Sequence, residues 1–248
     1  GDKVFGMTAP LAGCMCDFFL ADPSKLWHMP KAADFAQAAC MPVVALTSLQ
    51  ALRNNGLKEG DKVLILGASG GCGSAGVQIA KALGAHVTGV CSGKNVDLVT
   101  RLGADRVIDY TQRTVSEALA GEAGTFDVVY DTVKSSAAYD KDYEPEARPL
   151  LKKDGRYVAI NGSSADLLRY FFSNATGINV QRKGFKLLMT DQNAKDLRVV
   201  AEMMDDGKFS SVLDLTLDLT EDTLHAGFDR LKSRRTVGKI VMMLDKEE

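Results

Sequence analysis

The 248-residue sequence has little net charge and no long apolar run. Thirty Lys and Arg residues face 32 Asp and Glu residues, and the resulting formal charge of −2 disfavours nucleic acid as a partner. No apolar run approaches the roughly 18 residues that span a bilayer. No charged segment followed by an apolar one marks a signal peptide. A composition of 46% hydrophobic and 25% charged residues excludes a disordered, collagen-like or coiled-coil chain.

Cysteine and histidine are scarce and are not arranged as a metal or disulfide site. The five cysteines are odd in number and irregularly spaced, which predicts reduced thiols in an intracellular compartment, cytoplasmic by default. Cys14 and Cys16 lie two apart on an expected strand, where packed thiols are favoured over a metal site. The three histidines are scattered, and no Gly-x-Ser-x-Gly motif is present. We therefore assign no catalytic side chain and no metal ligand.

Short apolar segments alternate with helical segments along the middle of the chain, which predicts an α/β fold with a parallel sheet covered on both faces. Residues 34–52 read as a helix that Pro42 must kink or split. Strands expected at both ends predict that the termini share a second, β-rich lobe. Strands are expected at 3–7, 16–20, 63–66, 86–91, 106–108, 126–130, 156–160, 214–219 and 239–244, and helices at 73–83, 95–102, 115–119, 191–204 and 221–231.

The most informative segment is a glycine-rich turn between an expected strand at 63–66 and an expected helix. Such a turn directs backbone N–H groups and the positive end of a helix dipole to one point. Ala68, Gly70 and Gly73 align with the G-x-G-x-x-G fingerprint of dinucleotide-binding proteins. The turn therefore predicts a site for a diphosphate, and the alternative is a glycine loop that binds nothing.

The end of the next expected strand indicates which dinucleotide binds. An acidic residue about twenty residues beyond the glycines would bind a ribose 2′-hydroxyl. The sequence instead has Ser92 and Lys94 there, with no carboxylate before Asp97. A hydroxyl and a lysine suit a 2′-phosphate, so NADPH is favoured over NADH. The alternative is that Lys94 is a solvated loop lysine.

These residues, with others along nearly the whole chain, resemble the medium-chain dehydrogenase/reductase superfamily in its zinc-independent quinone oxidoreductase branch. The matching segments are 1–7, 38–47, 68–73, 102–110, 126–131 and 237–241.

The resemblance implies a Rossmann fold, that is, a doubly wound parallel sheet, with a partial GroES-like β lobe that lacks its N-terminal part. The implied domains are a lobe remnant at 1–33, an NADPH-binding domain at 34–212 and a return to the lobe at 213–248. Members of the family begin further upstream, so we expect the chain to be a fragment or to have lost a leader, and a lost leader would make a mitochondrial protein an alternative.

The resemblance also implies how NADPH would lie. The phosphates would contact the turn, the adenosine phosphate the loops after the next two strands, and the nicotinamide the cleft beyond. The residues carried over are Thr47, Ser69, Gly70, Gly71, Cys72, Gly73, Ser92, Lys94, Tyr110, Thr132, Ile160 and Asn161.

Val43 stands where zinc-using relatives have a cysteine, which disfavours zinc. Three features differ from the family pattern. Cys72 replaces a valine in the turn, and residues 14–16 (Cys-Met-Cys) replace a run that resembles small-Ala-Glu-Tyr. Lys134 stands where glycine is usual, on the nicotinamide side. The implied activity is hydride transfer from NADPH to a quinone or an α,β-unsaturated carbonyl compound. The alternatives are a non-catalytic NADPH-binding scaffold or sensor and a zinc alcohol dehydrogenase, and a homodimer through the sheet edge is a further expectation.

Overall fold

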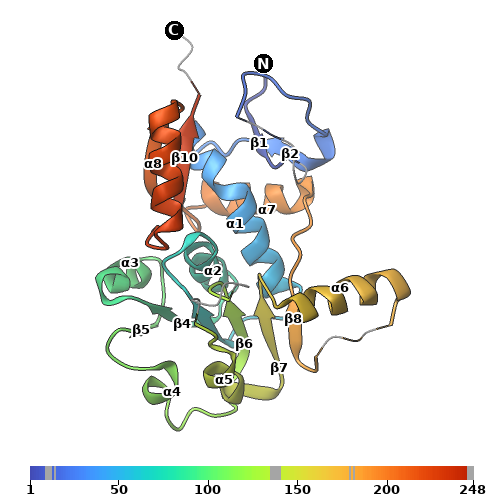
Figure 1. Ribbon diagram of the computed structural model, residues 1–248, viewed down its shortest axis with the longest axis vertical. Helices are drawn as coiled ribbons and strands as arrows, with labels where there is room; N and C mark the ends of the chain where they lie inside the picture. Colours follow the sequence, from blue (N-terminus) through green and yellow to red (C-terminus); the bar gives the residue numbers. More distant parts are fainter. Residues whose placement is uncertain (9–12, 14, 135–140, 179, 181, 245–248) are drawn as a thin grey trace.

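The computed structural model describes residues 1–8, 13, 15–134, 141–178, 180 and 182–244. Its centre is a six-stranded sheet in the order β5-β4-β3-β6-β7-β8, and every neighbouring pair of strands is parallel (Figure 1). The predicted parallel sheet is thus confirmed. Its strands are β3 (Lys62–Leu66), β4 (His86–Cys91), β5 (Arg106–Asp109), β6 (Phe126–Asp131), β7 (Leu151–Ala159) and β8 (Phe185–Leu187).

Both faces of this sheet are buried. Alternate residues of a strand point to opposite faces, so each strand contributes side chains to both sides. In β3, Val63 and Ile65 belong to one hydrophobic cluster and Leu64 and Leu66 to the other, and all four are fully buried. Covered faces of this kind explain why the strands read as short continuous apolar runs.

The first cluster packs under α1, α2 and α7, and the second packs under α4 and α5. The helices are α1 (Phe35–Arg53), α2 (Gly71–Ala82), α3 (Val96–Arg101), α4 (Val115–Ala118), α5 (Glu144–Ala147), α6 (Ser164–Thr176), α7 (Ala194–Asp205) and α8 (Glu221–Lys232), with short 3-10 turns at Pro23–Lys25, Gly93–Asn95 and Arg148–Leu150.

The strand order reverses between β3 and β6. From β3 the chain proceeds outward to β4 and β5, and then returns to the other side of β3 with β6, β7 and β8. In doubly wound sheets, ligands bind at the carboxyl ends of the strands where this reversal occurs. The fold therefore points to the segments that follow Leu66 and Asp131.

Helix α1 runs through Pro42 without being split, so of the two expected outcomes, a kink or a split, the split is wrong. Proline removes one backbone donor from a helix. Here both the proline and most of the helix are buried, and Asp34 and Gln37 cap the first turn reciprocally. Tertiary packing thus compensates for one lost hydrogen bond. By length and composition α1 could also cross a membrane, but 78% of its most apolar window is buried inside the protein.

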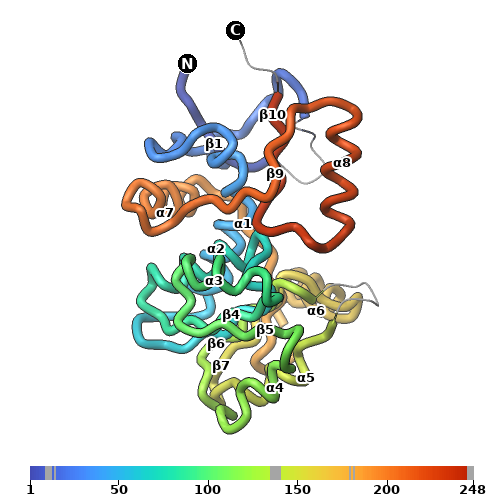
Figure 2. Tube along the Cα trace, turned by 90° about the vertical axis from the view of Figure 1, so that its left-hand side faces the viewer, coloured from blue at the N-terminus to red at the C-terminus, as the bar shows by residue number. Residues whose placement is uncertain are grey.

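The first and the last described residues of the chain lie at the same end of the molecule (Figures 1 and 2). Strands β1 (Val4–Gly6) and β2 (Leu26–His28) pair antiparallel, whereas β9 (Leu213–Asp218) and β10 (Lys239–Met243) pair parallel around α8. Among the described residues these are two separate sheets that each contact α1, and the expected β-rich lobe shared by the two ends stays a prediction. The domain boundaries at 33/34 and 212/213 stay a prediction.

Two other expectations also fail. Residues 16–20 form no strand, and Phe18 and Leu20 are almost fully exposed. Conversely, α6 and β8 form where the sequence patterns predict no element. The remaining predicted strands and helices are confirmed within a few residues of the expected bounds.

Candidate functional site

The glycine-rich turn joins the end of β3 to the start of α2. Gly70 is the residue that precedes the helix, and no side chain caps the first helical turn. The backbone N–H groups of Gly71, Cys72 and Gly73 form that turn, and N–H groups at these positions have no partner within a helix. The predicted phosphate-binding residues of the turn thus meet at one uncapped helix N-terminus, which is suited to an anion.

Close packing explains two of the glycines. A Cβ on Gly73 would lie 2.1 Å from the Gly67 carbonyl oxygen, so only glycine allows the helix to begin this near to the turn. Gly67 has φ +77°, and a Cβ there would meet Thr132 and Val133. By contrast, a Cβ on Gly70 would meet only the Gly67 oxygen, at 3.5 Å, which leaves open space beside this residue. That space is where a diphosphate can approach the backbone.

The loops after β4 and β5 bring the predicted adenosine-side residues to one edge of the sheet. Cys91 and Asp109 are register partners, so Ser92 and Lys94 follow one strand and Tyr110 the next. Lys94 and Tyr110 are exposed. Asp109, the only carboxylate among these positions, accepts hydrogen bonds from Thr111, which hold its pKa below the usual range. No carboxylate ends β4 in the sequence, but the Asp109 carboxylate of β5 lies beside Gly93, the residue between Ser92 and Lys94.

Asn95 is a residue of this region that sequence reasoning missed. Its Nδ2 donates to Ser69 Oγ at 3.0 Å and to Ser92 Oγ at 3.2 Å. One amide group thus ties the glycine turn to the loop after β4. Asn95 directly follows Lys94, so its place in the loop could be read from the sequence. Its partner Ser69 is 26 residues away, so the hydrogen bond between them could not.

On the opposite side of the turn, Thr132 follows β6. Its Oγ1 donates to the Leu66 carbonyl oxygen at 2.7 Å, and its backbone N–H donates to the same oxygen at 3.2 Å. The hydroxyl is therefore engaged in holding β6 against the start of the turn. Ile160 and Asn161 follow β7, where Ile160 is half-buried, Asn161 is exposed, and the Ile160 N–H donates to the Asp131 carbonyl oxygen. Both flank the same carboxyl edge as Thr132.

Thr47 lies on α1 and is 6% exposed. Its Oγ1 donates to the Val43 carbonyl oxygen at 2.6 Å and lies 2.7 Å from Thr190 Oγ1, in the segment after β8. The next residue, Ser48, donates to the Cys72 carbonyl oxygen at 2.8 Å. Ser48 thereby links helix α1 to the glycine turn. Thr190, which was not predicted, lies next to the predicted coenzyme-binding residue Thr47.

Cys72 is a structural residue of the turn. Burial raises the pKa of its thiol to about 11, and Lys239 and Tyr130 only partly oppose that shift. The thiol is thus neutral at physiological pH and does not act as a thiolate. This position tolerates the exchange of a valine for a cysteine because both are small and apolar.

The C-terminal segment reaches the turn from the other end of the chain. The Gly238 N–H donates to the Ser69 carbonyl oxygen at 2.9 Å, and Gly70 and Gly238 form a parallel β-bridge. Gly238 has φ +72°, and a Cβ there would lie 2.1 Å from the Val212 carbonyl oxygen. The following residue, Lys239, has its Cδ only 2.9 Å from where a Cβ of Gly71 would lie.

Lys239 is a second residue that sequence reasoning missed. It is half-buried, and its ammonium group has no hydrogen bond or ion pair with another described residue. Its side chain lies beside Gly71, the first residue of α2, so a cation that forms no ion pair with a described carboxylate lies near the positive end of a helix. An anion bound at the turn would satisfy both. Residues 237–241 resemble a family segment, but they lie far from the turn in the sequence, so the contact between Lys239 and Gly71 could not be predicted.

Lys134 does not project a free charge toward the predicted nicotinamide side. Its Nζ lies 2.9 Å from Glu144 and 3.3 Å from Asp142, and its side chain is 12% exposed. Burial alone would lower the pKa of Lys134, but the bond to Glu144 raises it, so the ion pair persists at neutral pH. The lysine that replaces the usual glycine at this position is therefore neutralised by nearby carboxylates.

Within the described ranges, no group of three His, Cys, Asp or Glu side chains could hold a metal ion. Cys14 lies outside the described residues, and Cys16 is exposed on a segment that is not a strand. Val43 is 47% exposed on α1. The predicted absence of a metal site stays a prediction.

The reversal of strand order, the uncapped turn and the lysine beside it define a protein of the dinucleotide-binding class. Comparison with known proteins gives the family. The family model described as zinc-binding dehydrogenase matches residues 102–242. The trans-enoyl reductase pgmF of Aspergillus terreus is 30% identical, over 99% of this chain and 70% of that protein.

Two further relatives agree. The mitochondrial NAD(P)H oxidoreductase RTN4IP1 of Mus musculus is 34% identical over 89% of this chain, which spans 59% of the mouse protein. The solved quinone oxidoreductase of Coxiella burnetii superposes with a TM-score of 0.78 at 26% identity, over 98% of this chain and 72% of that one.

The chain therefore belongs to the zinc-binding dehydrogenase family of the medium-chain dehydrogenase/reductase superfamily and is quinone oxidoreductase-like. It is an oxidoreductase that acts on small molecules, and its relatives and its fold indicate a nicotinamide coenzyme.

Proposed function

We propose that this chain binds NADPH at the glycine turn and that the whole protein transfers hydride from it to a quinone or an α,β-unsaturated carbonyl compound without zinc. The observation that carries the coenzyme proposal is the uncapped N-terminus of α2 facing the unpaired Lys239. The relatives named as quinone oxidoreductases and enoyl reductases support the substrate class.

The residues of the chain fit a dinucleotide diphosphate. The N–H groups of Gly71, Cys72 and Gly73 donate to phosphate oxygens, and the Lys239 ammonium neutralises their charge. Gly70 lets the backbone approach them. Ser92, Lys94 and Tyr110 receive the adenosine 2′-phosphate at the edge formed by β4 and β5. The preference for NADPH rests on Lys94 and on the absence of a carboxylate at the end of β4.

The bound coenzyme supplies the hydride, and the chain supplies position and a partly dry environment. Thr132 fixes the turn relative to the end of β6, while Ile160 and Asn161 line the same edge toward the nicotinamide. Thr47, held by Val43 and Thr190, closes the α1 side. Quinone reduction needs no side-chain acid within this chain if the oxyanion takes its proton from solvent, so its contribution is orientation.

Titration of the purified chain with NADPH and NADH, followed by the fluorescence of the reduced nicotinamide, tests coenzyme binding. We expect binding of both with a clear preference for NADPH, and no binding would contradict the proposed site. A turnover panel of quinones and enones with the full-length protein then tests the reaction. Full-length protein that binds NADPH but oxidises none of it would favour the scaffold or sensor function.

Measuring the zinc content of the purified protein distinguishes the proposed zinc-independent reductase from a zinc alcohol dehydrogenase. We expect substoichiometric zinc in active full-length protein, whereas one zinc per chain whose removal abolishes turnover would support an alcohol dehydrogenase. The homodimer also stays a proposal, to be tested by light scattering. An intracellular protein is consistent with the mitochondrial relatives, and its compartment is part of the same proposal.

A further inference from the structure

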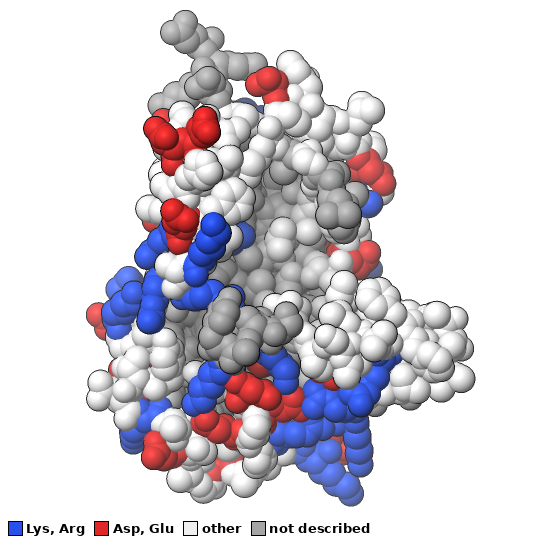
Figure 3. Space-filling model, in the orientation of Figure 1, with Lys and Arg blue, Asp and Glu red and all other residues white. Residues whose placement is uncertain are grey.

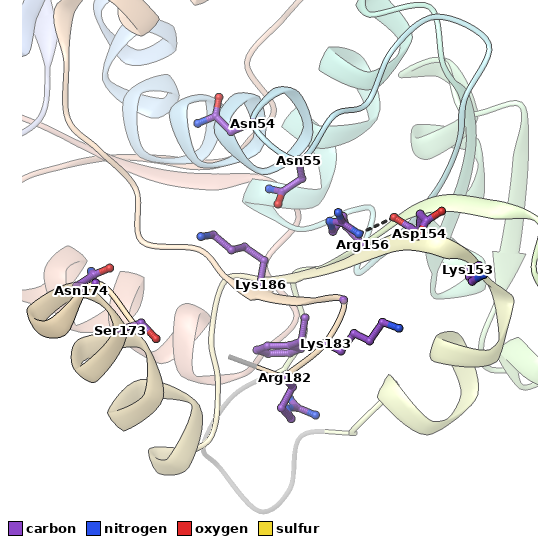
Figure 4. Close-up of a pocket in the computed structure, with 13 residues that line it drawn as sticks. Asn54, Asn55, Lys153, Asp154, Arg156, Ser173, Asn174, Arg182, Lys183 and Lys186 are labelled. Carbon is purple, nitrogen blue, oxygen red and sulfur yellow. Dashed lines mark hydrogen bonds between the residues drawn. The ribbon is translucent and has the colours of Figure 1, made fainter. Parts of the chain in front are cut away.

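A cationic groove lies near the amino ends of β7 and β8, whereas the glycine turn follows the carboxyl end of β3. It is lined by the first half of β7, the start of β8, the two residues that follow α1 and the end of α6, with a cavity volume of about 650 Å³. Figure 3 shows Lys and Arg gathered below α6, and Figure 4 shows the groove itself. Its charged lining residues are Lys153, Asp154, Arg156, Arg182, Lys183 and Lys186.

Most of these cations lack a carboxylate partner. Lys153, Lys183 and Lys186 are exposed, and their ammonium groups form no hydrogen bond or ion pair with another residue of the described ranges, although the Lys183 carbonyl oxygen accepts from Arg148. Arg156 donates to the backbone oxygen of Asp154 at 2.6 Å, which leaves its charge uncompensated. Only Arg182 is neutralised, through Glu144 and Asp166. A chain of net charge −2 thus concentrates four uncompensated cations on one groove with a single lining carboxylate.

Neutral hydrogen-bond donors border the same groove. Asn54 uses its Oδ1 to accept from Arg53, so its amide N–H groups remain available, and Asn174 lines the groove from the end of α6 (Figure 4). Cations with amide donors around a hollow of this volume suit a compact anion that carries several oxygens. The exposed apolar side of α6 does not contribute, since Leu168, Phe171 and Phe172 are not among the lining residues.

We propose that this groove binds an anion bearing two or more phosphate groups, at a site separate from the coenzyme turn. Four cations around a space of this size are best compensated by a ligand of several negative charges. Because the lysines are exposed, binding weakens as salt is raised. A soluble organic polyphosphate and a phospholipid headgroup share this chemistry.

Isothermal titration with inorganic tripolyphosphate at low ionic strength, with NADPH present in excess, tests the proposal. The variant Lys183→Gln/Lys186→Gln removes two groove cations, and Lys31→Gln/Lys195→Gln removes two exposed lysines elsewhere. We expect the groove variant to weaken tripolyphosphate at least tenfold and the control variant to change it less than twofold. Sedimentation with phosphatidylcholine vesicles, with and without phosphatidylinositol phosphate, forms the lipid arm.

Groove-dependent binding of tripolyphosphate supports a soluble ligand, and groove-dependent binding of the anionic vesicles alone supports a headgroup. Equal loss in both variants, or no saturable binding in either arm, overturns the proposal. The lysines could instead complement the carbonyl ends of α1 and α6. In that case the groove variant lowers Tm and leaves anion binding unchanged, which also overturns it. Lys94→Ala separates this site from the coenzyme site, because it weakens NADPH and spares the groove.

Discussion

Replacing Gly73 by alanine is expected to distort the coenzyme turn. The new Cβ would lie 2.1 Å from the Gly67 carbonyl oxygen, 2.7 Å from the Gly67 carbonyl carbon and 2.8 Å from the Ala68 Cα. All three are backbone atoms, so no side-chain rotation relieves the overlap, and the turn must move by at least about 1 Å. Overpacking of this kind costs about 1–3 kcal/mol, which corresponds to a fall in Tm of about 3–10 °C.

The same displacement misaligns the N–H groups that face the diphosphate. Losing one hydrogen bond to a charged group costs about 1.5–3 kcal/mol, so NADPH should bind about 10–100-fold more weakly. Thermal unfolding and a nicotinamide fluorescence titration measure the two effects on one sample.

Gly70→Ala is the matched control. Its Cβ would meet only one atom, at 3.5 Å, and its φ of −76° suits alanine. The folded protein should lose at most about 1 kcal/mol, the usual cost of a poorer N-cap. NADPH binding should nevertheless weaken, because the methyl group enters the space that the diphosphate uses. If Gly73→Ala leaves both Tm and NADPH affinity unchanged, the packing argument for this turn is refuted.

Three further perturbations test separate parts of the site and fold. Lys94→Ala should weaken NADPH about tenfold more than NADH, measured by paired titrations, and equal losses would remove the 2′-phosphate assignment. Lys239→Gln should weaken the binding of both coenzymes by a similar factor of about ten, because it removes an unpaired cation beside a helix N-terminus. The Tm of the free protein should not fall. A loss of affinity confined to NADPH would mean that Lys239 contacts the adenosine 2′-phosphate instead. Burial would raise the pKa of Asp196, but hydrogen bonds from Arg53, Gln50 and Asn193 lower it below its usual value. This carboxylate therefore stabilises the fold above a pH of about 4 and loses that contribution as pH falls through the lowered pKa. Chemical unfolding from pH 6 to pH 3 should show a shallower loss for Asp196→Asn, which is already destabilised at pH 6, and parallel curves would contradict this.

The parts of the fold that the sequence predicted are those with local signals. Strand β3 is a continuous apolar run because both of its faces are buried, and its glycine turn follows at once. Helix α6 was missed although its apolar residues, such as Leu168 and Phe171, recur at helical spacing, and in the structure these residues are exposed. Strand β8 has only three residues, too few to show a period.

The candidate site divides along the same line. The turn and Lys94 could be predicted as coenzyme contacts because strand, glycines and helix are adjacent in the sequence, and that assignment stays a prediction. Thr190 and Lys239 were not found, since their contacts with Thr47 and Gly71 connect segments 143 and 168 residues apart. The split expected at Pro42 does not occur, because burial of most of the helix outweighs the local effect of proline.

The charge distribution around the turn implies that the coenzyme should stabilise this protein. The N-terminus of α2 carries about half a positive charge, and Lys239 adds a full charge near it that forms no ion pair with a described carboxylate. In the free protein this arrangement is unfavourable, and it is tolerated because solvent screens the half-exposed ammonium. A bound diphosphate reverses the sign of the interaction, so Tm should rise with NADPH concentration by mass action. That rise should shrink as ionic strength increases and should be smaller in Lys239→Gln at equal NADPH. A salt-independent rise, identical in both proteins, would mean that the energy of coenzyme binding comes from contacts other than this charge.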